Sequence, residues 1–406
     1  MLLSGMPELR PVRRRLQQAH DLQDIRQVAR RRTPRSIFDY VDGAADNERA
    51  AERNLEAFRN VEFLPQVLRN VGQVDPSTTI LGRPSALPLI FGPTGFTRMM
   101  NHEGEIAVGR VAERNQIPYA LSTMGTTSPE QLAEAAPNLD RWFQLYMWRD
   151  RDASRALVDR ARESGFGTIM LTIDVPVAGA RLRDRRNGMT MPPSLNLQSF
   201  AGIVRHPNWW INALTTDPLK FAAFDGGAEQ FMELTNRMFD PQVTFEDLRW
   251  LRKIWPGKIV VKGILNQADA QTVIDCGADA IVVSNHGGRQ LDNAAAPLKV
   301  LPGIRSALGN HAEIYLDSGV RSGVDMAAAI ALGANAVMIG RPYLYGIMAG
   351  GEQGVQRVTQ IFDEGFRRAM ALLGAARVQE LGPHLLYGNQ TQSRELDSVL
   401  SGIPHS

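Results

Sequence analysis

The 406-residue sequence contains one cysteine and no long apolar run. A single cysteine cannot form an intrachain disulfide, so we expect a reducing compartment. Cys276 falls near the end of a helical-looking segment, where we expect it to pack in the core. The N-terminal "MLLSGMPELRPVRRR" has too short an apolar stretch for a secretory signal, and nothing approaches the ~18 apolar residues of a membrane span. These absences predict a cytoplasmic protein.

The net charge is also small, and metal-binding motifs are absent. The formal charge of +2 is too small to imply a nucleic-acid or membrane partner by itself. The basic runs "RPVRRR" and "RRRTPR" lack the interleaved aromatic residues of a nucleic-acid site, so we interpret them as solvated helix ends or interface groups. Seven histidines occur without an HExxH motif or a cysteine pair, and GxxxxGK[ST] is absent. We therefore expect no metal site, no nucleic-acid partner and no Walker-type phosphate loop.

Short β-rich apolar runs recur along the chain. They begin at Leu87, Tyr119, Trp142, Thr168, Lys258, Ala280, Glu313 and Ala336. Helix signals fill the intervals: a capping box at Ser128, an N-cap at Asp152 and helix-ending glycines at Gly165 and Gly333. This alternation predicts a parallel sheet closed into a (β/α)₈ TIM barrel, with an open doubly wound sheet as the alternative.

The spacing also predicts how a single domain is organised. Residues 1–86 are expected to form an N-terminal helical extension, whose best helical stretch is 35–58. The barrel spans 87–380 and is followed by a C-terminal tail, 381–406. An insertion of about 176–255 follows the fourth strand, and insertions of that size usually form a lid or a binding surface. Trp209 and Trp210 within it either touch a membrane or pack over the barrel mouth or a subunit interface.

Polar residues collect where the predicted strands end. Side chains alternate across a strand, so residues of equal parity share a face. On this basis the rim carries Gln144 and Tyr146, Thr172 and Asp174, Lys262, Ser284 and His286, Asp317 and Arg341. The carboxyl ends of the strands are where barrel enzymes place their active sites. A lone histidine or arginine is usually structural, but this set, with Arg289 and Arg181, favours proton abstraction from a small anionic substrate.

Two glycine-containing loops suggest a cofactor. "DSGVRSG" follows the seventh strand and "IGRPYLYG" follows the eighth, each with an arginine. Loops at these two positions form the usual phosphate site of this fold. We therefore expect a phosphorylated cofactor.

The combination "SNHGGRQLD", "DSGVRSG" and "IGRP" resembles the FMN-dependent 2-hydroxy-acid dehydrogenases and oxidases over nearly the whole chain. "WFQLYMWRDR", "DVPVAGARLRD" and "MIGRPYLYGIMAGGE" make the L-lactate dehydrogenase branch the nearest match. The resemblance implies that His286 is the general base, oriented by Asp174. It implies that Arg289, Arg181 and Tyr40 hold the substrate carboxylate and that Tyr146 contacts the hydroxyl. Lys262 would stabilise negative charge on the flavin.

The same resemblance implies the FMN-binding residues. Those expected near the ring are Gly92, Pro93, Thr94, Gly95, Ser122, Gln144, Thr172, Lys262 and Ser284. Those expected at the ribityl and phosphate groups are Asp317, Gly319, Arg321, Gly340 and Arg341.

Two departures from glycolate oxidase concern the substrate pocket. Met124 replaces a tryptophan and Ala178 replaces a larger aliphatic residue, so L-lactate or a larger L-2-hydroxy acid is expected rather than glycolate. The electron acceptor is expected to be a quinone or another carrier, and oxygen is the alternative. An amine or peptide substrate and a silent flavin-binding protein remain further alternatives, although the silent protein would be expected to have lost some of these residues. The resemblance also suggests a homotetramer and a peripheral contact of the insertion with the inner face of the membrane.

Overall fold

The eight predicted strands form one closed parallel barrel. The computed structural model describes residues 11–188, 209 and 240–388. The barrel strands are β3 (Leu89–Phe91), β4 (Tyr119–Ser122), β5 (Arg141–Leu145), β6 (Thr168–Thr172), β7 (Lys258–Ile264), β8 (Ala280–Val283), β9 (Glu313–Leu316) and β10 (Ala336–Ile339). They pair in chain order, and β10 closes the barrel on β3. The (β/α)₈ prediction is confirmed, and the open-sheet alternative is wrong.

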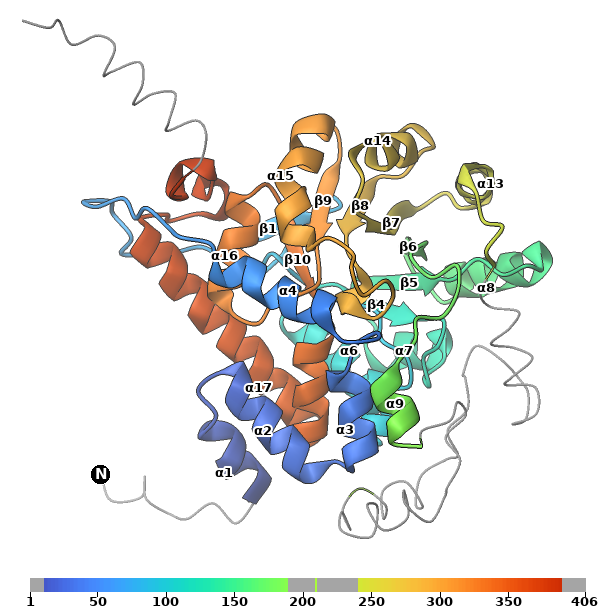
Figure 1. Cartoon of the computed structure of the whole chain (residues 1–406), viewed down its shortest axis with the longest axis horizontal. Coiled ribbons are helices and arrows are strands. Elements are labelled where there is room, and N and C mark those ends of the chain that lie inside the picture. Colours follow the sequence, from blue (N-terminus) through green and yellow to red (C-terminus); the bar gives the residue numbers. More distant parts are fainter. Residues whose placement is uncertain (1–10, 189–208, 210–239, 389–406) are drawn as a thin grey trace, which may run out of the picture.

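Helices surround the barrel (Figure 1). They are α5 (Thr97–Met100), α6 (Gly104–Arg114), α7 (Pro129–Ala135), α8 (Arg151–Glu163), α13 (Phe245–Ile254), α14 (Gln267–Asp275), α15 (Pro297–Leu308), α16 (Gly323–Ala331) and the long α17 (Arg341–Leu373). The strand parity separates two apolar layers: Met170 lies inside the barrel, whereas Leu171 lies in the layer between strands and helices. Cys276 is buried at the end of α14, as expected.

Most predicted helix boundaries agree with the structure. Ser128 and Gln131 form the capping box of α7, and Gly333, with a φ of 111°, follows α16. The N-cap of α8 was predicted incorrectly. Asp150 accepts hydrogen bonds from the backbone N–H groups of Asp152 and Ala153, so Asp152 lies in the first turn. Both aspartates suit a helix start, and the sequence pattern did not distinguish them.

The N-terminal extension contains helices and a hairpin. The helices are α1 (Pro11–Gln17), α2 (Leu22–Arg32), α3 (Arg35–Asp42) and α4 (Arg49–Arg59). The helical stretch predicted over 35–58 forms two helices rather than one, because the chain turns between α3 and α4, with positive φ at Asp46 and Glu48. The hairpin of β1 (Thr78–Ile80) and β2 (Arg83–Ser85) was not predicted. It turns at Leu81 and Gly82, and Ile80 packs into the interior of the barrel.

The insertion and the tail are described in part. The short helix α9 (Leu182–Arg186) and helix α13 lie within the predicted insertion. Trp209 packs against the core, and its indole nitrogen donates to the Met99 carbonyl at 3.0 Å. Trp210 lies outside the described residues. After α17 come two short 3-10 helices, η2 (Val378–Glu380) and η3 (Pro383–Leu385), and the Leu64 N–H donates to the Leu385 carbonyl.

Candidate active site

A cavity of about 360 Å³ opens at the carboxyl ends of the barrel strands. The expected site residues that line it are Tyr40, Gly92, Pro93, Thr94, Gly95, Ser122, Met124, Tyr146, Thr172, Ala178, Arg181, Lys262, His286, Arg289, Asp317, Gly319, Arg321, Gly340 and Arg341. They come from the carboxyl-terminal halves of the eight strands, from the loops that follow them and from α3. Closure of the barrel and packing of α3 against it therefore bring together residues that are up to 301 positions apart (341 − 40).

Three expected site residues are not among those that line the cavity, but each contacts one that is. Gln144 accepts a hydrogen bond from the Ser122 hydroxyl at 2.9 Å. Ser284 accepts from the Lys262 ammonium group, also at 2.9 Å. Asp174 bonds to the ring of His286. The structure therefore gives Ser284 a role in holding Lys262 rather than a direct place in the cavity wall.

The loop after β8 holds His286 in an unusual backbone conformation. His286 has a φ of 57°, and Gly287 and Gly288 follow with φ values of 66° and 76°. A non-glycine residue in this region is strained, and such strain persists only where the surroundings enforce it. Here the Ser284 hydroxyl accepts from the His286 N–H and the Ser318 hydroxyl accepts from the Gly287 N–H. These bonds, in the short 3-10 helix η1 (His286–Gly288), present the imidazole to the cavity.

The imidazole contacts one end of a chain of charged groups. Its Nδ1 lies 2.8 Å from Asp174 Oδ1, which leaves Nε2 as the ring nitrogen available to a ligand. Lys262 Nζ lies 3.8 Å from the other oxygen of Asp174 and 3.2 Å from Asp317. A buried ammonium group therefore sits between two carboxylates.

Burial and pairing act in opposite directions on these groups. Burial acts to raise the pKa of Asp174, but the interactions with His286 and Lys262 hold that pKa below its usual value. Burial acts to lower the pKa of Lys262, but Asp317 and Asp174 raise it above its usual value. Pairing therefore keeps both side chains ionised.

Two arginines and a tyrosine form the wall of the cavity near His286. The guanidinium carbons of Arg181 and Arg289 each lie 5.1 Å from the centre of the Tyr40 ring. Arg289 also donates to the carbonyls of Tyr40 and Gly43. Burial and the neighbouring Arg181 lower the pKa of Arg289 to about 10. Two like charges at one wall are unfavourable alone, and a bound carboxylate would relieve the repulsion.

The remaining polar groups suit a flavin ring. Among the described residues, the buried Gln144 Nε2 and Thr172 Oγ1 have no hydrogen-bond partner. Unpaired buried polar atoms are costly, and the acceptors and donors along the edge of an isoalloxazine ring would supply the missing partners. Burial, Asp174 and Tyr40 raise the pKa of Tyr146, so its phenol remains a neutral hydrogen-bond donor. The donor set therefore fits FMN.

The phosphate end of the site has glycines and arginines. Gly319 has a φ of 110°, and a Cβ there would lie 2.7 Å from the Asn54 carbonyl oxygen. Arg341 lines the cavity, but its guanidinium also donates to the carbonyls of Val41, Gly287 and Gly43. It therefore joins the α3–α4 turn to the His286 loop, a contact that was not predicted.

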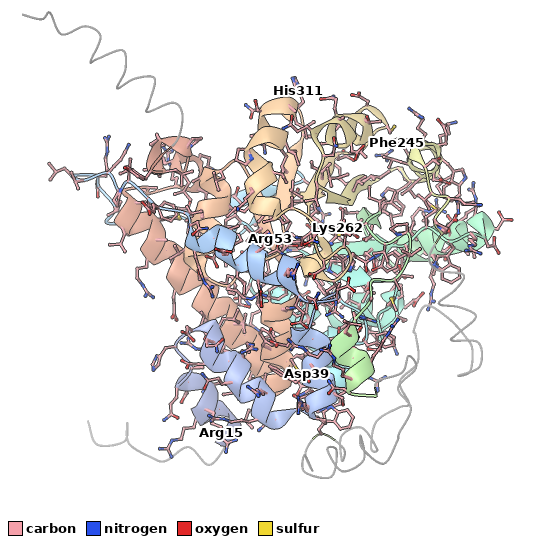
Figure 2. All side chains as sticks on the ribbon, viewed as in Figure 1. Arg15, Asp39, Arg53, Phe245, Lys262 and His311 are labelled. Atoms are coloured by element: carbon pink, nitrogen blue, oxygen red, sulfur yellow. The ribbon has the colours of Figure 1, made fainter. Side chains whose placement is uncertain are left out.

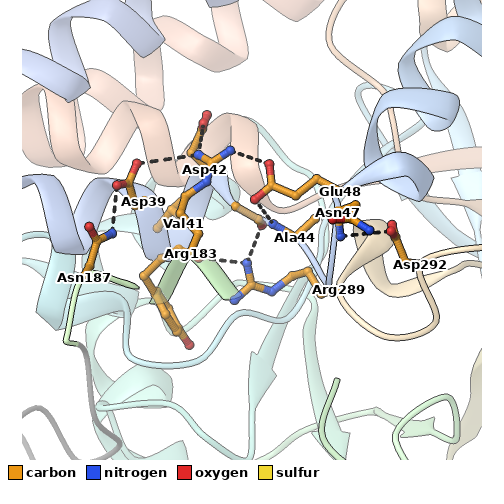
Figure 3. Close-up of polar contacts among 12 residues, drawn as sticks. Asp39, Val41, Asp42, Ala44, Asn47, Glu48, Arg183, Asn187, Arg289 and Asp292 are labelled. Atoms are coloured by element: carbon orange, nitrogen blue, oxygen red, sulfur yellow. Dashed lines mark hydrogen bonds and ion pairs between the residues drawn. The ribbon is translucent and has the colours of Figure 1, made fainter. Parts of the chain in front are cut away.

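Several residues that shape the site were missed in the sequence. Arg183 on α9 bonds to Asp42 and Glu48, and Asn187 donates to Asp39 at 2.8 Å (Figure 3). These contacts fasten α9, which Arg181 precedes, to the N-terminal extension. Helix positions such as these are ordinary surface positions in the sequence, so no local signal marks them.

A buried carboxylate, also missed, organises the loops after β3 and β4. Glu105 Oε1 accepts from the backbone N–H groups of Thr97 and Thr126, and Oε2 accepts from the hydroxyls of Thr126 and Thr127. These loops carry Gly95 and Met124, which line the cavity. The sequence signal that could have identified Glu105 as buried is its position among the apolar residues of a helix.

The barrel, the ion-paired Lys262 and the unpaired polar atoms of Gln144 and Thr172 define a flavin-dependent barrel enzyme. Comparison with known proteins identifies the family: residues 29–388 match the FMN-dependent dehydrogenase family, and the chain belongs to it. FMN is therefore its cofactor, as expected.

Named relatives cover nearly the full chain. A putative L-lactate dehydrogenase of Mycobacterium tuberculosis is 50% identical over 98% of this chain and 95% of that protein. Human 2-hydroxyacid oxidase 1 is 38% identical over 91% and 96%. The structure of the monotopic membrane protein (S)-mandelate dehydrogenase covers 91% of this chain and 100% of its own, with 35% identity and a TM-score of 0.88.

Proposed function

We propose that this protein oxidises an L-2-hydroxy acid to the 2-oxo acid, with His286 as the general base. The reaction class is that of an FMN-dependent L-2-hydroxy-acid dehydrogenase, as the family and its named relatives support. The observation that carries the proposal is the imidazole of His286, braced by Asp174 at 2.8 Å, in the same cavity as Arg181 and Arg289.

Each side chain has a role that follows from its position. Arg289 and Arg181 bind the substrate carboxylate beside Tyr40, and the neutral Tyr146 phenol donates to the substrate hydroxyl. His286 Nε2 removes one substrate proton, and Asp174 stabilises the imidazolium that results. When bound, FMN accepts the two electrons of the oxidation. Lys262 supplies positive charge beside it.

The FMN would be held by groups around the cavity. Ser122 and Thr172 would contact the ring from the cavity wall, Gln144 would reach it from behind Ser122 through its unpaired Nε2, and the segment Gly92–Gly95 would line one side. Gly319, Arg321 and Arg341, with Gly340, lie where its phosphate is expected.

Anaerobic mixing with L-lactate, D-lactate, glycolate and L-mandelate tests the proposal. Oxidised flavin absorbs at about 450 nm. We expect an L-acid to bleach this band in the wild-type protein, and we expect no bleaching in His286→Ala. A flavin-loaded protein that none of these acids bleaches would contradict the substrate class, and amines and peptides would then be tested.

For the substrate, we propose L-lactate or a larger L-2-hydroxy acid. Met124 and Ala178 both line the cavity, and the small side chain at position 178 leaves room for a substrate side chain. A higher kcat/KM for glycolate than for L-lactate would contradict this assignment.

For the acceptor, we propose a quinone or another carrier, with oxygen as the alternative. After anaerobic reduction, rapid reoxidation by a soluble quinone and slow reoxidation by air are expected. The reverse order of rates would identify an oxidase.

The proposals for assembly and location rest on the family resemblance. We expect a homotetramer, which light scattering would test. No helix in the described ranges is long and apolar enough to cross a membrane. We also propose that the insertion makes a peripheral contact with a membrane. Flotation of the protein with liposomes, with and without the insertion, tests this contact.

A further inference from the structure

The segment from α1 to the first residue of α3 carries a large excess of positive charge. Residues 11–35 contain eight arginines and two aspartates, a net charge of +6 (8 − 2) in a chain whose total is +2. The rest of the chain is therefore net negative. The positive charge is therefore concentrated in this N-terminal segment rather than spread over the protein.

The two aspartates are already engaged by backbone groups. Asp21 accepts from the Asp24 N–H and Asp24 accepts from the His20 N–H. Arg26 pairs with Asp42, and Arg35 lies 3.4 Å from Asp39. Within the described ranges, no carboxylate lies within ion-pair distance of the other α1 and α2 arginines that follow. These are Arg14, Arg15, Arg30, Arg31 and Arg32.

Three of these arginines line one open pocket. Arg15 of α1 and Arg31 and Arg32 of α2 border a depression of about 440 Å³ between the helices, where Asp24 is the one carboxylate among the lining residues. Figure 2 shows Arg15 on the outer side of α1, away from the barrel. Arg32 Nε is buried and has no hydrogen-bond partner among the described residues. Burial and the charge of Arg15 lower the pKa of Arg32.

Helix ends account for only part of this arrangement. Arginines in the last turn stabilise a helix through its dipole, and Arg14, Arg15 and Arg30–Arg32 are all in last turns. That effect does not explain why the two helix ends place their cations around the same pocket, where they repel each other. An anion in the pocket would remove the repulsion and supply the missing acceptor for Arg32.

We propose that the face defined by Arg14, Arg15, Arg30, Arg31 and Arg32, the arginine face, docks on an anionic phospholipid surface. A lipid headgroup phosphate would occupy the pocket, and the exposed arginines around it would face neighbouring headgroups. A lipid surface fits better than a nucleic acid because residues 11–35 contain no phenylalanine, tyrosine or tryptophan for base stacking. The contact is electrostatic, since the apolar residues Leu16, Leu22 and Ile25 are buried in the fold.

Vesicle binding of the full-length, FMN-loaded protein tests this proposal. The probe is a phosphatidylcholine vesicle with or without one third phosphatidylglycerol, followed by flotation. Binding is expected with the anionic lipid, is expected to weaken as salt rises, and is expected to be absent with phosphatidylcholine alone. The triple variant Arg15→Gln, Arg31→Gln and Arg32→Gln should bind roughly 100-fold more weakly, at about five-fold per arginine.

A matched variant separates the arginine face from total charge. Arg59→Gln, Arg69→Gln and Arg377→Gln remove the same charge from exposed positions outside α1 and α2 and should leave vesicle binding nearly unchanged. Equal loss in the two triple variants would overturn the proposal, as would undiminished binding in the first. Arginine-dependent binding to polyglutamate without binding to vesicles would assign the face to an acidic protein instead. Soluble lactate oxidation by both variants is a separate readout, so failure here leaves the enzymatic proposal standing.

Discussion

The side-chain amides of Asn54 and Asn285 hydrogen-bond to each other in both directions, at 2.9 and 2.7 Å. Asn54 lies on α4 of the N-terminal extension, and Asn285 immediately precedes His286. The Asn285 oxygen also accepts from the Gly288 N–H. The N-terminal extension is therefore in direct contact with the strained loop that carries the proposed base, and it contributes to the site beyond Tyr40.

Replacing Asn54 should test this contact. Asn54→Ala removes both amide bonds, so we expect a loss of about 1–2 kcal/mol in stability and a roughly ten-fold fall in kcat, because a misplaced base slows proton transfer. Urea unfolding, FMN content and steady-state kinetics are the measurements. Glu56→Ala, an exposed change on the same helix, should alter none of them. A normal kcat in a destabilised Asn54→Ala protein would limit the contact to folding.

Asp174 should give a pH-dependent contribution to stability. Its folded pKa lies below the ordinary value of 3.8, so its contribution is present above that pH and is lost as the pH falls through the folded pKa. Asp174→Asn should therefore lower the urea midpoint at about pH 7, and its difference from the wild type should shrink below about pH 4. The exposed Asp152→Asn serves as the control and should show a small difference at both pH values. A difference for Asp174→Asn that grows toward acid pH would contradict the assignment.

Lys262 can be compared with a lysine on the same strand. Lys262→Met leaves Asp174 and Asp317 without their cation, so we expect weaker FMN binding and flavin reduction slowed by roughly 100-fold or more. Lys258→Met removes an exposed pair with Asp279 at the other end of β7 and should leave both unchanged. Anaerobic stopped-flow and FMN titration are the measurements. Equal rates in the two variants would remove Lys262 from the proposed chemistry.

The barrel was predictable because each strand is a short apolar run and each helix has its own end signals. The rim residues followed from strand parity, which is why His286, Lys262 and Asp317 could be grouped from the sequence alone. The α3–α4 turn, the β1–β2 hairpin and the Asn54–Asn285 pair could not be grouped in this way. The turn and the asparagine pair depend on contacts between segments over 200 residues apart, such as the bonds from the Asn47 and Ala50 N–H groups to Asp292. The hairpin pairs locally, but its turn is held by a bond from the Leu81 N–H to Glu313, 232 positions away.

Arg289 should be sensitive to replacement by the other cation. Lysine keeps the charge but cannot form a bidentate pair with a carboxylate or reach both carbonyls that Arg289 contacts. We expect Arg289→Lys to raise KM by about 100-fold, with a smaller change in kcat. Arg183→Lys changes an arginine of the same N-terminal network that does not line the cavity, so its KM should stay near that of the wild type. A similar rise in both would attribute the effect to the loop rather than to substrate binding.

Gly319 and Gly82 offer a matched pair for the cofactor end of the site. Both have positive φ, 110° and 77°, so alanine strains the backbone at either position. A Cβ at Gly319 would also lie 2.7 Å from the Asn54 carbonyl oxygen and 3.0 Å from the Phe58 ring, whereas a Cβ at Gly82 would meet nothing within 4 Å.

The added methyl at 319 must push α4 away from the loop after β9, where the phosphate is expected to bind. Gly319→Ala should therefore lower FMN affinity by ten-fold or more, about 1.4 kcal/mol. Gly82→Ala should lower stability by about 1 kcal/mol and leave FMN affinity unchanged. Fluorescence titration of the apoprotein with FMN measures both, and equal affinities in the two variants would show that α4 can move without disturbing the phosphate end.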